Sequence, residues 1–317
     1  MDKTMMETQV TQDMIDAINE ELVKRNEKFT VSLQASKKPC GEEYGVMINT
    51  NDSTKPVIYP TDTSLTPDNI CKVTNNIIEV YRENINVRFD VDKFISKDYI
   101  EANVMPRFIR KDFEEKLKEN NTFYIPWLDL LVIFYINVGV AVDDMSGSIT
   151  LTNPILNSVG IDTDNLFALA KTNLEQTVEI TPITTILSKM MGTDILPIDD
   201  AFGPKMHVAT NNKTVYGATV ILTDKFIEHV RTHFGETALI IPSSVHEVIV
   251  VDAGVDDAEA VAQMIREVNS NELATKDILE NHPYFFYNNG VHDKPEANTL
   301  CKNDSDTDAC LELYENK

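Results

Sequence analysis

Apolar residues recur along the chain at spacings that alternate between those of helices and those of strands. The first helical stripe consists of Met14, Ile15, Ile18, Leu22 and Val23. Thr11 stands where an N-cap is expected. Strand-like alternation follows over 28–34 and 44–49, and a second helix is expected to run from about 66 to 82. This pattern predicts a small meander packed beneath the first helix.

The most apolar run of the chain lies at 127–142. It is shorter than the roughly 20 residues that a membrane span needs, and Asp129 and Asn137 interrupt it. It therefore predicts a buried strand or strand pair. The region before it, 90–120, is highly charged and helical in bias, and another amphipathic helix is expected to open at Asp162.

Residues 206–252 carry the most consistent local signals. A strand is followed by the turn sequence Asn-Asn-Lys at 211–213 and by a second β-rich run, which predicts a hairpin. Thr223 caps a helix that ends before Gly235, and two β-branched strands follow. A helix over 256–268 is expected to bury Val261, Met264, Ile265 and Val268.

These elements predict an α+β fold with mostly antiparallel strands and helices packed on one side, divided into two lobes. The expected regions are an N-terminal helix and meander at 1–62, a helical middle region at 63–205, a C-terminal α+β lobe at 206–290 and a disordered acidic tail at 291–317.

Charge and cysteine content narrow the classes of partner and compartment. The 317 residues carry a formal net charge of −23, which disfavours binding to nucleic acid and to anionic membrane surfaces. Four scattered cysteines without a CxxC spacing argue for free thiols, and the N-terminus lacks the apolar core of a signal peptide. A cytoplasmic location is therefore expected.

Several sequence runs carry a family resemblance: TNNKTVYGATVIL, LIIPSSVHEVIVV and MIREVNSNELATKDILENHPYFFY, with PWLDLLVIFYINV and NLFALAKTNLEQ upstream. Over about residues 10–290 the chain resembles the domain-of-unknown-function family 5688, whose members come mostly from Clostridia. It resembles more distantly a second uncharacterised Firmicutes family. An additional GVA in the middle loop of this chain departs from both families. Neither resemblance implies a reaction, a substrate or a catalytic residue.

Two groups of residues are candidates for chemistry. Ser243, Ser244, His246 and Glu247 lie within five positions, so a serine nucleophile with His246 as base is one hypothesis. A tight turn at the two serines with His246 facing outward is the simpler interpretation. His229 and His233 stand four apart on a helix, as metal-ligand pairs do, but the glutamate of the zinc motif HExxH is absent.

The sequence thus favours a non-enzymatic binding or regulatory protein, with no cofactor expected and a protein partner left open. One alternative is an enzyme of unrecognised type, such as a hydrolase, using Ser244, His246 and Glu247. A second is an acidic decoy of a nucleic-acid-binding partner, suggested by the net charge of −23.

Overall fold

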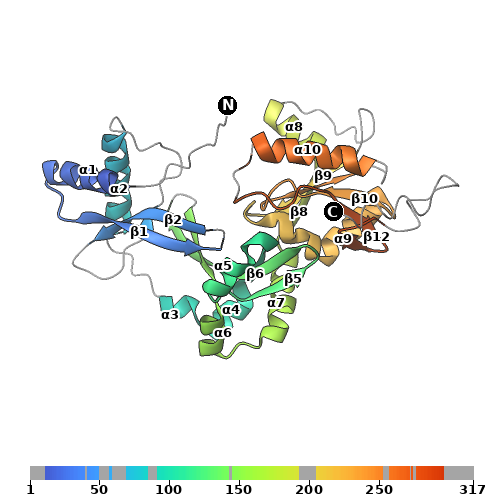
Figure 1. The fold of residues 1–317 in the computed structure, drawn as a ribbon, viewed down its shortest axis with the longest axis horizontal. Coiled ribbons are helices and arrows are strands. Elements are labelled where there is room, and N and C mark those ends of the chain that lie inside the picture. Colours follow the sequence, from blue (N-terminus) through green and yellow to red (C-terminus); the bar gives the residue numbers. More distant parts are fainter. Residues whose placement is uncertain are drawn as a thin grey trace. The chain divides into compact units, whose positions relative to one another are not determined.

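The computed structural model describes residues 11–39, 41–49, 57–58, 69–84, 91–142, 145–192, 205–252, 257–271, 273 and 276–295. It divides into two compact units (Figure 1). The first unit comprises Met1–Phe94 and Gly139–Ser146, and the second comprises Ile95–Val138 and Gly147–Lys317. Strands in each sheet pair antiparallel, which confirms the predicted α+β class.

In the first unit, helices pack on a three-stranded meander of order β1-β2-β3. Its elements are α1 (Gln12–Lys24), β1 (Thr30–Lys38), β2 (Gly41–Asn49), β3 (Val57–Ile58), α2 (Ile70–Asn84) and α3 (Val91–Phe94). The shared core contains Ile15, Ile18, Leu22, Phe29, Val31, Val46, Ile48, Val73, Ile77 and Ile78. The meander and helix predicted from the apolar spacing are therefore confirmed.

One position of the predicted α1 stripe is wrong. Val23 is 75% exposed, whereas Leu22 beside it is buried. Consecutive helical residues point about 100° apart, so the stripe of Ile15, Ile18 and Leu22 leaves Val23 on the solvent side. The Asn19 side chain fastens α1 to β1, since its amide donates to the Val31 carbonyl and its oxygen accepts from the Val31 N–H.

The second unit begins with α4 (Lys97–Asn103), β4 (Val104–Arg110), the 3-10 helix η1 (Lys111–Phe113), α5 (Glu114–Glu119), β5 (Tyr124–Trp127), β6 (Leu130–Val142), β7 (Met145–Thr150), α6 (Asn153–Val159) and α7 (Thr163–Glu175). It continues with β8 (Val178–Pro182), α8 (Ile183–Met191), β9 (Met206–Asn211), the 3-10 helix η2 (Gly217–Leu222), α9 (Asp224–Phe234), β10 (Ala238–Ile241), β11 (Val248–Val251), α10 (Ala258–Asn271), β12 (Tyr284–Tyr287) and β13 (Gly290–His292).

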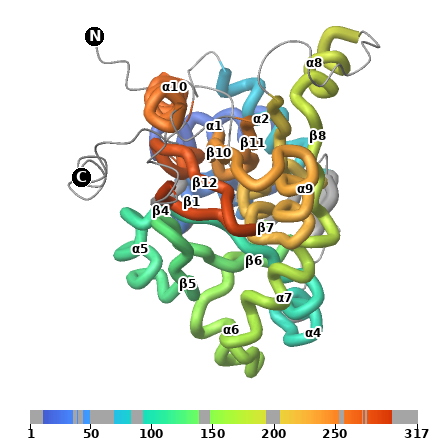
Figure 2. The backbone as a smooth tube through the Cα atoms, turned by 90° about the vertical axis from the view of Figure 1, so that its right-hand side faces the viewer, coloured from blue at the N-terminus to red at the C-terminus, as the bar shows by residue number. Residues whose placement is uncertain are grey.

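The first sheet of this unit is built around β6. Its order is β4-β6-β5, and β7 also pairs with β6. Every residue from Leu130 to Ile136 is buried, as the apolar run predicted. Helix α7 lies beside α4 (Figure 2), and the Asn173 amide of α7 donates to the carbonyls of Glu101 and Val104. Strand β4 was not predicted from the sequence, because the charged region around it favoured a helix.

The second sheet has the order β13-β12-β10-β11-β9-β8. The capped helix α9 is confirmed, because the Thr223 side chain accepts from the Phe226 N–H and Gly235 ends the helix. The predicted hairpin partner of β9 is wrong: residues 217–222 form η2, which is buried throughout. The Asn211 side chain accepts from the backbone N–H groups of Lys213 and Val215, so the chain turns out of the sheet after β9.

The structure also corrects the predicted inner face of α10 and the predicted start of the acidic tail. Met264 and Val268 of α10 are 47% and 43% exposed, so only part of the predicted inner face is buried. Strand β13 pairs with β12 at the point where the acidic tail was expected to begin, and residues 296–317 lie outside the described residues. No helix in the described part of the chain is long and apolar enough to cross a membrane.

Gly217 is expected to tolerate no larger residue. A Cβ built there would lie 2.2 Å from Thr210 Oγ1 and 2.5 Å from the backbone oxygen of His246. Since backbone cannot move aside cheaply, Gly217→Ala should lower the free energy of unfolding by about 2–3 kcal/mol in urea denaturation. Gly290→Ala is the control, because its nearest contact is the movable His292 ring at 3.3 Å. Equal effects of the two substitutions would contradict this packing.

Candidate functional site

The turn between β5 and β6 places a carboxylate at the tip of a hairpin. Trp127 and Leu130 are Cα partners, so Leu128 and Asp129 form the two-residue loop. Leu128 adopts φ 49°, a left-handed conformation that is uncommon for a non-glycine residue. The turn thereby holds Asp129 directly before β6, the buried central strand of its sheet.

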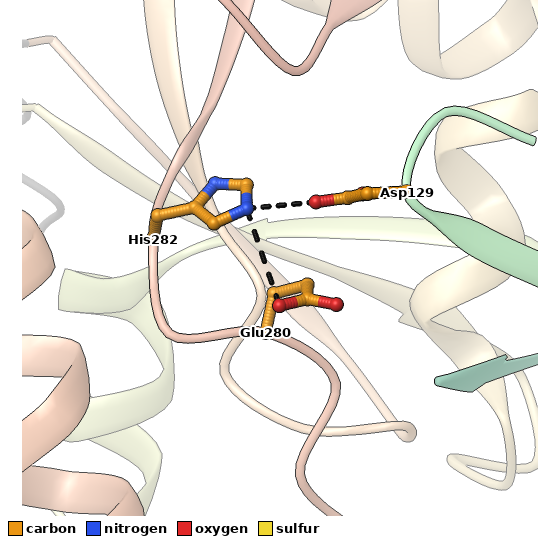
Figure 3. A group of neighbouring side chains, drawn as sticks. All are labelled: Asp129, Glu280 and His282. Atoms are coloured by element: carbon orange, nitrogen blue, oxygen red, sulfur yellow. Dashed lines mark hydrogen bonds and ion pairs between the residues drawn. The ribbon is translucent and has the colours of Figure 1, made fainter. Parts of the chain in front are cut away.

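Glu280 and His282 face this carboxylate from the segment that leads into β12 (Figure 3). His282 Nε2 lies 2.7 Å from Asp129 Oδ2 and 4.0 Å from Glu280 Oε2. One ligand atom from each of the three residues lies within 4.8 Å of the other two. We call these three residues the Asp129 group.

Neighbouring residues orient each member of the Asp129 group. The Tyr284 hydroxyl donates to Asp129 Oδ1 at 2.7 Å, which leaves Oδ2 for His282. The Nδ1 of His282 lies 3.1 Å from the Pro283 carbonyl, so Nδ1 carries the donated proton and Nε2 faces the carboxylates. The Asn269 amide of α10 donates to the Glu280 carbonyl at 3.0 Å.

The charges in this group influence one another. Burial alone would raise the pKa of Asp129, but hydrogen bonds from His282 and Tyr284 outweigh it and lower that pKa. The hydrogen bond to Asp129 raises the pKa of His282 to about 9 against the effect of burial. Burial, and then the charge of Asp129, raise the pKa of Glu280. At neutral pH His282 is therefore an imidazolium beside the Asp129 carboxylate. The surroundings of Glu280 disfavour the charged form of its carboxyl group.

The sequence reading missed this group. In the sequence Asp129 stands out only as an interruption of an apolar run, and it lies 153 positions before His282. The local signal that could have pointed to it is a charged residue within an apolar run, directly before the strand that buries every residue from Leu130 to Ile136. Nothing in the spacing of Glu280 and His282 identifies their partner.

The Ser244 hydroxyl and the His246 ring, the candidate nucleophile and base, have different hydrogen-bond partners. Ser244 is buried, and its hydroxyl accepts from the backbone N–H of His246 at 3.0 Å. The His246 ring instead lies against Tyr216 and Asp277, since Nδ1 accepts from the Tyr216 backbone N–H at 3.3 Å and Nε2 lies 3.7 Å from Asp277 Oδ1. Both ring nitrogens of His246 are thus engaged.

The remaining two candidates in this stretch contribute backbone contacts. The Ser243 N–H donates to the Ile241 carbonyl at 2.9 Å, and the Glu247 carbonyl accepts from the Ser244 N–H at 3.3 Å. Around His246, the Tyr216 ring carries the Arg107 guanidinium 4.0 Å from its centroid. The hydrogen bond from His246 holds the pKa of Asp277 below its usual value.

The helical histidine pair meets a third histidine. The rings of His229 and His233 stack with their centroids 4.0 Å apart, and His207 Nδ1 lies 2.7 Å from His229 Nε2. His207 comes from β9, where alternate residues are buried. Burial, and then the neighbouring His233 and His207, lower the pKa of His229 to about 4. His229 is therefore held neutral at pH 7.

The chain belongs to a family of unknown function, DUF5688, whose model matches residues 8–288. This confirms the family resemblance drawn from the sequence runs. No curated protein and no solved structure matches the chain. Both candidate groups and the Asp129 group lie within the matched residues.

The half-buried His229 should make the protein less stable in acid. The unfolded chain protonates His229 at its ordinary value of 6.5, whereas the folded protein does so only at about 4. The unfolded state therefore binds more protons between these values, and stability falls as the pH drops from about 6.5 towards 4. Because the ring is partly exposed, we expect a loss on the order of 1 kcal/mol.

The measurement is the free energy of unfolding of native protein and His229→Gln at pH 7 and pH 4.5. The variant should lose about 1 kcal/mol less than the native protein between the two pH values. His292→Gln, which removes a histidine outside this group, should keep the native pH dependence. Identical curves for the native protein and His229→Gln would contradict the assignment.

Proposed function

We propose that this member of the family is a non-enzymatic binding protein and that its ligand is a divalent metal ion of the zinc class. The ion is held by Asp129 Oδ2, Glu280 Oε2 and His282 Nε2. The observation that carries the proposal is the convergence of these three ligand atoms within 4.8 Å of one another. Imidazole nitrogen and carboxylate oxygen are both common ligands of zinc.

The residues around the group support a ligand role. Metal-binding histidines usually donate their second nitrogen to a backbone carbonyl or carboxylate, as His282 does to Pro283. Metal-binding carboxylates are in turn hydrogen-bonded, as Asp129 is by Tyr284. One nitrogen with two oxygens suits zinc, iron or manganese better than calcium, which takes six to eight oxygens.

A purely structural ion pair between Asp129 and His282 does not explain the position of Glu280. Asp129 and His282 satisfy each other at 2.7 Å without a third group. Glu280 adds a second carboxylate 4.0 Å from His282 Nε2, and its raised pKa shows that its charge is disfavoured there. A divalent cation would offset both negative charges, whereas a single imidazolium offsets one. On binding, the ion displaces the proton that His282 Nε2 carries in the ion pair.

The contacts of His246 support a non-enzymatic role. A general base needs a free nitrogen within reach of the nucleophile, and both nitrogens of His246 are engaged by Tyr216 and Asp277. The enzyme alternative based on Ser244, His246 and Glu247 is thereby disfavoured, while the acidic-decoy alternative continues to rest on net charge.

A cytoplasmic location and a clostridial origin are part of the proposal, supported by the scattered cysteines and the family resemblance. Cys71 is a free thiol.

The proposal is tested by calorimetric titration of the chelator-treated full chain with zinc. We expect one ion per chain at the Asp129 group. His282→Gln should weaken binding by more than about 100-fold, because it removes a direct ligand, and Tyr284→Phe by about 10-fold to 100-fold, because it removes an orienting hydrogen bond. His292→Gln is the matched control and should bind zinc as the native chain does.

Two results of the titration would overturn the proposal. If zinc binding is lost in His229→Gln and His233→Gln but kept in His282→Gln, the ion occupies the helical histidine pair instead. If the native chain binds no zinc, cobalt or manganese, the Asp129 group is an ion pair only. Circular dichroism of each variant shows whether a loss of binding reflects a loss of fold.

A further inference from the structure

We propose that the ion bound by the Asp129 group takes a small oxyanion, a carboxylate or a phosphate, in its open coordination position, and that Arg110 is the second contact of this anion. This inference rests on the proposed metal site. It assigns the chain a ligand beyond the ion itself.

The number of protein ligands leaves room for an external one. Structural zinc sites are closed by four protein ligands, whereas sites that exchange a ligand keep three and an open position. Within the described residues, the group contains three side chains that can act as ligands. Their side chains are 29%, 23% and 39% exposed for Asp129, Glu280 and His282, so a small molecule can reach the ion from solvent.

Arg110 is placed by strand pairing on the same side of the sheet end. It is the last residue of β4 and the Cα partner of Leu130, the residue that follows Asp129. Its guanidinium pairs with Asp112 and lies 5.9 Å from the Phe113 ring centroid, which keeps it at this strand end. Trp127 of β5 is the other Cα partner of Leu130, and its ring centroid lies 6.0 Å from that of Tyr284, which donates to Asp129.

The local charges do not oppose an anion, because Arg110 offsets Asp112 and a bound divalent ion offsets the two carboxylate ligands. A divalent ion neutralises the carboxylates of Asp129 and Glu280, and a guanidinium presents a planar pair of N–H donors that matches a carboxylate or phosphate. The net charge of −23 opposes an anion at long range. At physiological salt, however, charges farther than about 8 Å are largely screened, so the residues at the site decide the affinity.

The test uses the full chain loaded with cobalt, whose visible absorption reports its ligands. Inorganic phosphate and acetate are titrated in separate arms. We expect a saturable change in the spectrum, and the arm with the lower half-saturation shows which oxyanion the site prefers. Arg110→Gln should raise the half-saturation concentration about tenfold without changing cobalt affinity, which corresponds to about 1.4 kcal/mol.

Lys111→Gln is the matched control, since it removes one positive charge from the neighbouring residue and should leave the half-saturation unchanged. A cobalt spectrum that neither anion alters would overturn the inference and leave the metal site standing. The absence of any cobalt spectrum would instead overturn the proposed function. Equal weakening by Arg110→Gln and Lys111→Gln would show a general charge effect and overturn the assignment of Arg110.

Discussion

The burial of β6 is the constraint on which the second unit depends. From Leu130 to Ile136 every residue is at most 3% exposed, so the strand must be covered on both faces and paired on both edges. That requirement fixes the register of β4 and β5, and the register in turn fixes where the hairpin turns. Asp129 stands at that turn, and Arg110 ends the strand on the other edge. The positions of both charged residues therefore follow from apolar packing.

Local signals in the sequence were sufficient for much of the fold. Thr223 and Gly235 bound α9 because a side-chain oxygen and a flexible backbone satisfy helix ends within a few residues. The apolar run at 127–142 indicated burial by composition alone. Strand β4 and η2 were lost because tertiary context overrode local preference: the charged ends of β4 resemble a helix, and the β-rich residues 217–222 coil against Thr210 and His246.

The candidate sites were harder to predict from the sequence than the helices and strands. His229 and His233 were found because they lie on one helix face, but His207 joins them only through β9. Ser244 and His246 are two positions apart in sequence, yet the Ser244 hydroxyl contacts the His246 backbone and the His246 ring contacts Tyr216. The Asp129 group brings together residues whose closeness is set by two sheets. Proximity in sequence was a poor guide to proximity of functional atoms, because strand pairing, not chain order, places them.

The distance along the chain between Asp129 and His282 also has a consequence for biosynthesis. Closing a loop of 153 residues costs entropy that only completed tertiary contacts repay, so contacts of this kind form late in folding. As the ribosome delivers the chain from its N-terminus, β5 and β6 emerge long before residues 280–282. The three side chains of the site can therefore meet only after the segment that leads into β12 has been synthesised.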